Sequence, residues 1–154
     1  MRTLRLFVLL VFAQMLFIGA AFAQEHGTAE EAKALVGKGL AHIKAVGIDK
    51  AAEDINANKD GKWLEKDLYI VIIKNDGTMV AHGSNKILVG KNTLELKDPN
   101  GKFFTKESAE AAKKGGGWVD YMFTNPATKK LSPKSMYSAP IPGFDGFIGV
   151  GIYK

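Results

Sequence analysis

The stretch LYIVIIKNDGTMVAH, residues 68–82, decides the fold. Its first six residues are all β-branched, aromatic or otherwise apolar, and the run is too short for a helix of that character. It therefore predicts a strand that is buried on both faces. NDGT, residues 75–78, supplies side chains that tolerate the positive φ of a tight hairpin turn. MVAH then predicts the antiparallel return strand over residues 79–82.

Helical periodicity precedes this hairpin. Thr28 and Glu31 have the spacing of a capping box, in which a hydroxyl and a carboxylate satisfy free amide donors. Apolar residues then recur on one helical stripe at Ala32, Leu35, Val36, Leu40, Ile43 and Val46. The pattern predicts one long amphipathic helix ending near Gly47. A second, short helix follows over residues 48–55, before the turn residues NKDG at 58–61.

An irregular connection follows the hairpin, from Gly83 to Phe104. Loops of this length in a compact domain usually serve a site. KESAEAAKK, residues 106–114, predicts a further helix, with Gly115 just past its end and two more glycines that let the chain reverse. Three antiparallel strands in series then account for the rest of the chain: GWVDYMF (117–123), KSMYSAPI (134–141) and GFIGVGIY (146–153).

Five antiparallel strands behind a long helix predict an α+β domain. The amphipathic helix is able to cover only one face of the sheet. The long connection and the short helix are therefore expected to cover the other face. A loop-built cover over a sheet is where a pocket for a small molecule forms most easily.

The N-terminus has the order of a secretory signal peptide. Arg2 and Arg5 precede an apolar run that ends in the small-x-small triplet Ala21-Phe22-Ala23. The predicted organisation is a signal peptide over 1–23, a helical region over 24–62 and a sheet region over 63–154. The body of the protein is expected to be periplasmic or secreted after cleavage. The alternative is a body tethered by an uncleaved anchor, because the apolar run is almost long enough to span a bilayer.

Composition excludes several classes of function. The chain has no cysteine, so disulfides, thiol nucleophiles and haem attachment through cysteine are absent. Its net charge of +5 comes from 19 lysines and two arginines against 16 acids, with no run of five like charges, which gives no support to nucleic-acid binding. The motifs GxSxG and HExxH are also missing, and His26, His42 and His82 do not have metal-ligand spacing. Neither an enzyme, nor a metal site, nor a cofactor is predicted.

From Trp63 to Tyr153 the sequence resembles a single Cache domain of type 2, a PAS-like sensor module of bacteria that lies outside the cytoplasm. The resemblance rests on a Trp and a Tyr before the first strand, DGT at the hairpin, the strand-end His82, and the segments LVGKN, KDPNGK, GGGWVDY, PKSMY and GVGIY. It implies a five-stranded sheet with a long N-terminal helix on one face and a small-molecule pocket on the other. Relatives are sensing domains of chemoreceptors, histidine kinases and cyclic-dinucleotide enzymes, and several bind acetate, pyruvate or lactate.

The resemblance implies a ligand-binding role for two basic residues. His82 ends the second strand, where its ring is expected to donate a hydrogen bond to a carboxylate. Its alternative role is structural, with the ring satisfied by backbone groups of the next loop. Lys134 is the second candidate cation. On strand periodicity Lys134 and Met136 share one face, and Tyr137 faces the other unless a bulge intervenes.

Four aromatic residues complete the predicted site: Trp63, Tyr69, Tyr121 and Tyr137. Tyr121 lies in phase with Val119 and Phe123, and a wall of that kind with one hydroxyl suits a small polar ligand. The alternative role of each of these residues is structural, as part of the apolar core. Asp98 and Gly101 of DPNG are interpreted as turn residues, because the further acids of a calcium loop are missing.

The leading hypothesis is a stand-alone secreted domain that binds a short carboxylate and presents it to a membrane-bound sensor kinase, chemoreceptor or transporter. It is stand-alone because no second membrane helix or output domain precedes Lys154. The alternative is a protein–protein docking module with an empty pocket. A ligand panel distinguishes the two hypotheses.

Overall fold

The computed structural model describes residues 26–154, so the predicted signal peptide at residues 1–23 lies outside the described residues. The helices and strands, in chain order, are α2 (Ala29–Val46), α3 (Ile48–Ala57), β1 (Leu64–Glu65), β2 (Leu68–Lys74), β3 (Met79–His82), the 3-10 turn η1 (Lys86–Leu88), α4 (Phe104–Lys113), β4 (Gly117–Thr124), β5 (Leu131–Pro140) and β6 (Gly146–Tyr153).

Helix α2 begins and ends where the sequence predicts. The Thr28 hydroxyl accepts from the amide of Glu31, and the Glu31 carboxylate accepts from the amide of Thr28, which confirms the capping box. The helix ends at Gly47, whose amide donates to the Ile43 carbonyl. Most of its predicted apolar stripe is buried against the sheet, namely Ala32, Leu35, Val36 and Ile43, whereas Leu40 is half-buried and Val46 is 42% exposed. Gly39 permits this close approach, because a Cβ there would overlap the side chain of Ile148.

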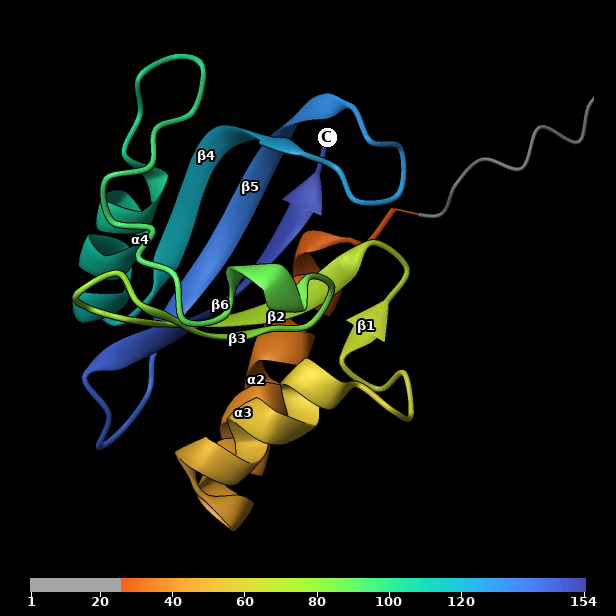
Figure 1. The fold of residues 1–154 in the computed structure, drawn as a ribbon, viewed down its shortest axis with the longest axis vertical. Coiled ribbons are helices and arrows are strands. Elements are labelled where there is room, and N and C mark those ends of the chain that lie inside the picture. Colours follow the sequence, from red (N-terminus) through yellow and green to blue (C-terminus); the bar gives the residue numbers. More distant parts are fainter. Residues whose placement is uncertain (1–25) are drawn as a thin grey trace, which may run out of the picture.

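The strands form an antiparallel sheet in the order β3-β2-β6-β5-β4 (Figure 1). Strand β2 lies between β3 and β6, so that Val71 pairs with both His82 and Gly149. The five predicted strands are therefore confirmed. The two-residue strand β1 is an addition, and it pairs with the start of β2 through Leu64 and Tyr69.

Each face of the sheet has its own apolar core. Alternation along β2 sends Ile70 and Ile72 toward α2, while Tyr69, Val71 and Ile73 face the other side. This second core is completed by residues of α4, β4, β5 and β6. The two layers leave β2 buried on both faces, as predicted.

The prediction that the short helix covers the second face is wrong. Helix α3 packs beside α2 in the first core, through Ala51, Ala52 and Ile55. A single residue, Gly47, joins the two helices, and it is too short to carry the chain around the edge of the sheet. Helix α4 covers the second face instead, and Figure 1 shows it on the opposite side of the sheet from α2 and α3.

Hydrogen bonds hold the connection between β3 and α4 in place along its length. The Met79 amide donates to the Lys91 carbonyl at 2.9 Å, and the Thr93 amide donates to the Gly77 carbonyl at 2.8 Å. The Asp98 carboxylate accepts from its own turn and also from the amide of Met122 in β4, at 3.0 Å. These bonds fix the connection as a cover over the sheet.

Helix α4 begins at Phe104, two residues before the predicted start, because Phe104 and Thr105 are buried against the sheet. Gly115 follows its last turn with a φ of 97°, which confirms its predicted role, and donates to the Ala112 carbonyl.

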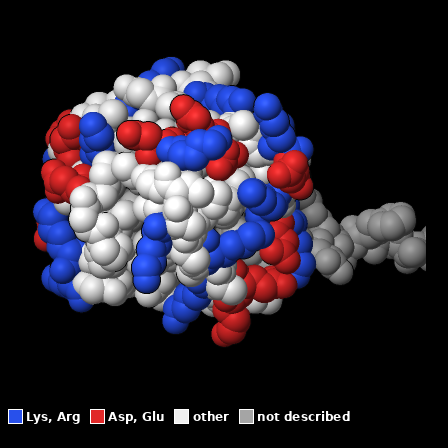
Figure 2. All heavy atoms as spheres, turned by 90° about the horizontal axis from the view of Figure 1, so that it is seen from below, with Lys and Arg blue, Asp and Glu red and all other residues white. Residues whose placement is uncertain are grey.

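On the face of the molecule shown in Figure 2, basic and acidic side chains alternate around an area of uncharged residues. Within residues 26–154, none of the helices is both long enough and apolar enough to span a bilayer.

Candidate functional site

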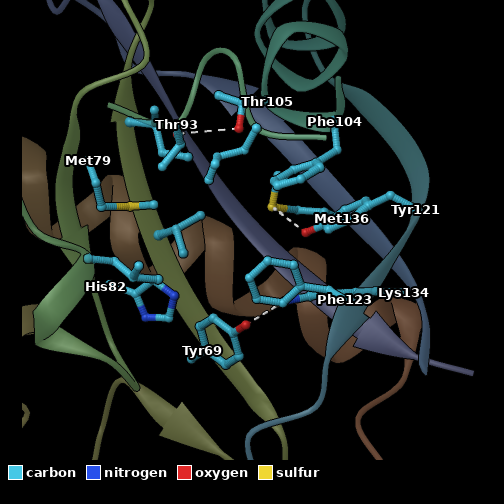
Figure 3. Close-up of a pocket in the computed structure, with 14 residues that line it drawn as sticks. Tyr69, Met79, His82, Thr93, Phe104, Thr105, Tyr121, Phe123, Lys134 and Met136 are labelled. Atoms are coloured by element: carbon cyan, nitrogen blue, oxygen red, sulfur yellow. Dashed lines mark hydrogen bonds between the residues drawn. The ribbon is translucent and has the colours of Figure 1, made fainter. Parts of the chain in front are cut away.

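A cavity of about 70 Å³ lies between the second face of the sheet and its cover (Figure 3). Four of the predicted site residues line it: Tyr69, His82, Tyr121 and Lys134. They come from β2, β3, β4 and β5, so the antiparallel pairing brings together residues that lie far apart in the sequence. Val71, Ile73, Met79, Phe104 and Met136 make the remaining wall mostly apolar.

Lys134 is the buried cation of this cavity. The residue is 3% exposed, and its Nζ donates to the Tyr69 hydroxyl at 2.6 Å. The ammonium also lies over the rings of Tyr69, Tyr153 and Phe123, at 4.3, 4.8 and 5.2 Å from their centroids. No carboxylate of the described residues forms an ion pair with it. A buried charge without a counter-ion favours the binding of an anion.

The neighbouring strand makes room for this lysine. Lys134 pairs across β5 and β6 with Tyr153, and Gly151 lies two residues before Tyr153 on the same face. A Cβ built on Gly151 would overlap Cε of Lys134. The absence of a side chain at Gly151 therefore lets the lysine lie flat against β6 and reach Tyr69.

His82 faces the cavity in its neutral form. Its Nδ1 accepts from the amides of Asn85 and Ser84, at 3.0 and 3.3 Å. The remaining hydrogen of the neutral ring is therefore on Nε2. Burial, and after it the positive charge of Lys134, lower the pKa of His82 to about 4. The ring stacks on Tyr69 with 4.8 Å between centroids, so the cavity receives a fixed, neutral N–H donor.

Tyr121 closes the apolar side of the cavity. Its ring stacks on Phe104 with 4.6 Å between centroids, and within residues 26–154 its hydroxyl donates only to Sδ of Met136, at 3.7 Å. Burial raises the pKa of this phenol above its usual range, so the hydroxyl keeps its proton. A weak sulfur acceptor is readily exchanged for a ligand oxygen.

Trp63 and Tyr137 do not line this cavity, because they lie on the other side of the sheet. Trp63 is buried in the α2–α3 core, where its ring contacts His42. Tyr137 packs against Trp118 and under the ammonium of Lys33. The register of β5 with β4 is regular, without a bulge that would turn Tyr137 to the face of Lys134.

The structure also brings to the cavity residues that the sequence did not single out. Thr93 lies in the long connection and Thr105 in the first turn of α4, and their hydroxyls are 3.3 Å apart. Leu88 of η1 lies at the mouth. The length of the connection was the one signal for these residues, since loops of this length usually serve a site.

The mouth leads into a wider outer hollow of about 490 Å³. The hollow shares Tyr69, His82, Leu88 and Phe123 with the inner cavity and continues to Lys129, which is exposed. The outer hollow therefore adjoins the cavity of the buried ammonium and adds a second positive charge at its rim.

The chemistry that the cavity offers is anion binding. An ammonium and a neutral imidazole N–H supply the donors, and the apolar wall strengthens both by excluding water. No cluster of three or more His, Asp or Glu side chains with the geometry of a metal site occurs within residues 26–154.

Comparison with known proteins relates this architecture to bacterial sensors. The sensor histidine kinase MctS of Rhizobium johnstonii is 30% identical over 88 residues, which are 57% of this chain and 19% of the kinase. The chain thus spans about a fifth of the length of that relative. A methyl-accepting chemotaxis protein of Vibrio parahaemolyticus has a crystal structure that superposes with a TM-score of 0.65 at 26% identity. The match covers 80% of this chain and 86% of that one.

A third likeness is one of fold alone. A Cache chemosensory domain described as recognising carboxylic acids superposes with a TM-score of 0.65 at 22% identity, over 81% of this chain and 92% of that chain. The family model of the single Cache domain 2 matches residues 11–154. With the five-stranded sheet, the N-terminal helix and the opposite-face cavity in place, the chain belongs to the single Cache domain 2 family of extracytoplasmic sensor domains.

Proposed function

We propose that this protein is a non-catalytic binding domain for a short organic carboxylate. The observation that carries the proposal is the buried Lys134 ammonium, which has no acidic partner among the described residues and faces a small apolar cavity. In the proposed complex one carboxylate oxygen accepts from Lys134 and the other from Nε2 of His82. The fold neighbour described as recognising carboxylic acids supports the same ligand class.

The size of the cavity limits the length of the acid. A volume of about 70 Å³ has room for roughly five water-sized groups, since one such group needs about 15 Å³. Acetate, glycolate and propionate, which have no more than five non-hydrogen atoms, meet this limit. Longer acids must extend through the mouth into the outer hollow.

The relationship to a histidine kinase and a chemotaxis protein supports a role in sensing. We propose that the bound form is presented to a membrane-bound sensor kinase, chemoreceptor or transporter. The arginine-led apolar segment at residues 1–23 supports export to the periplasm with cleavage after Ala23. The mass of the exported protein tests the cleavage, because a retained segment leaves the protein tethered.

The test of ligand binding is calorimetry of the purified protein with formate, acetate, propionate, pyruvate and lactate, and with methylamine as a contrast. We expect one or more acids to bind and the amine not to bind. Lys134→Met should abolish binding, whereas Lys114→Met, which removes an exposed lysine beyond the last turn of α4, should leave it unchanged. Failure of every acid to bind would leave the docking module as the better hypothesis.

A further inference from the structure

The two ends of the cavity differ in chemistry. Figure 3 shows Tyr69 and His82 at one end and Thr93 and Thr105 at the other, with Met136 between them. The first end holds the ammonium of Lys134 and supplies donors. The opposite end carries the hydroxyls of Thr93 and Thr105, which take no part in the proposed binding of the carboxylate.

The hydrogens of both threonine hydroxyls are already in use. The Thr93 hydroxyl donates to the Gly77 carbonyl at 3.0 Å, and a carbonyl oxygen is only an acceptor. The Thr105 hydroxyl therefore donates to Thr93, at 3.3 Å. Each hydroxyl has a single hydrogen, so only lone pairs remain. Since Thr105 is 1% exposed and Thr93 is 4% exposed, water does not satisfy these lone pairs freely.

This end of the cavity therefore accepts hydrogen bonds without donating any. A carboxylate or carbonyl group of a ligand would find no donor there, and an alkyl end would leave the acceptors unused. An ammonium end would lose its hydration without gaining a counter-charge, because no Asp or Glu of residues 26–154 lines the cavity. A hydroxyl is neutral and supplies one hydrogen-bond donor, so it is the group that fits best.

We propose that the ligand is a short ω-hydroxy acid, with its carboxylate at Lys134 and His82 and its terminal hydroxyl donating to Oγ1 of Thr105. The inference rests on the proposed function and narrows its ligand class. The methylene groups lie against Val71 and Met136 in the apolar middle of the cavity. Glycolate, the two-carbon member of the class, has five non-hydrogen atoms and fits the available volume, whereas 3-hydroxypropionate has six and exceeds it by one.

The test compares acids that differ only by the hydroxyl: acetate with glycolate, and propionate with 3-hydroxypropionate. Calorimetry on the wild-type protein should show that the hydroxylated member of at least one pair binds about three- to tenfold tighter, as one net hydrogen bond predicts. Thr105→Val keeps the shape of the side chain and should bring this ratio to about one. Thr105→Ser keeps the hydroxyl and should keep the ratio.

Ser108 of the same helix supplies the matched control. Its hydroxyl is fully buried and has no hydrogen-bond partner among the described residues, but it does not line the cavity. Ser108→Ala should therefore leave the ratio unchanged. The melting temperature of each variant, measured without ligand, separates a loss of selectivity from a loss of folding.

Four outcomes overturn the inference. Equal affinity within both pairs overturns it while leaving the carboxylate proposal intact, and so does a ratio that survives in Thr105→Val. Binding of β-alanine as tightly as 3-hydroxypropionate overturns the assignment of a hydroxyl. Absence of binding by any acid overturns the proposed function and this inference with it.

Discussion

Replacing Lys134 with methionine tests whether the buried ammonium serves a ligand or holds the fold together. In the ligand-free protein the ammonium gains one charged hydrogen bond, to Tyr69, worth about 1.5–3 kcal/mol. Three aromatic rings contribute roughly 0.5–1 kcal/mol each. Desolvation of the ion opposes these terms by several kcal/mol, so the net contribution to the free energy of unfolding is close to zero.

Lys134→Met should therefore unfold within about 1.5 kcal/mol of the wild type when no ligand is present, as measured by urea denaturation. Methionine fills the same volume with apolar atoms, and the Tyr69 hydroxyl keeps its contact with Tyr153 at 3.3 Å. With an acid at 100 times its Kd, the wild type gains about 2.7 kcal/mol and the variant gains nothing. A gain of that size raises the melting temperature by several degrees.

Two results would refute this reasoning. A loss of about 3 kcal/mol or more in ligand-free Lys134→Met would show that the ammonium is a structural tie among Tyr69, Phe123 and Tyr153. An unchanged response to the acid would show that the anion binds elsewhere. Lys114→Met is the control for the general effect of losing one positive charge, because that lysine is exposed.

Three further predictions concern the surroundings of the lysine. The folded protein lowers the pKa of His82 from 6.5 to about 4, so the folded state binds fewer protons than the unfolded state between these values. The free energy of unfolding should be highest above pH 6.5 and fall by on the order of 3 kcal/mol toward pH 4. In urea denaturation at a series of pH values, His82→Gln should lose this part of the pH dependence. An equal pH dependence in the variant would contradict the assignment. Gly151→Ala places a methyl group against Cε of Lys134 and should weaken acid binding by more than about tenfold in calorimetry. Unchanged affinity would mean that the lysine does not lie against β6 at Gly151. Asp98→Asn turns an amide donor toward the Met122 amide and should lower the free energy of unfolding by about 1–3 kcal/mol in urea; no loss would show that the carboxylate does not anchor the connection.

The sheet and its first core were predictable because strand and helix periods are local properties of the sequence. The run from Leu68 to Lys74 marks β2, and the helical stripe marks α2. The placement of α3 was not predictable in this way. Its apolar residues fit either face of the sheet, and only the one-residue link at Gly47 decides between them.

The candidate site was predictable only in part. Strand alternation correctly separates Lys134 from Tyr137, because the register of β5 is regular. Trp63 precedes β2 by a turn, and no period in the sequence relates its side chain to a face of the sheet. Thr93 and Thr105 meet only because the long connection folds back onto the start of α4. The neutral state of His82 likewise depends on burial and on backbone amides that no motif specifies.

The glycines of β6 also bear on how this fold can diverge. Gly149 and Gly151 face the cavity side and leave their space to Met136 and Lys134, which lie across them. At these two positions β6 contributes backbone but no side chain, so the side chains of β5 determine the shape of the cavity. Substitutions on β5 can therefore resize or recharge the site while the backbone of the sheet stays as it is. Selection for a different ligand would then act on few positions of β5, and a side chain at Gly149 or Gly151 would be excluded by the residues that lie across them.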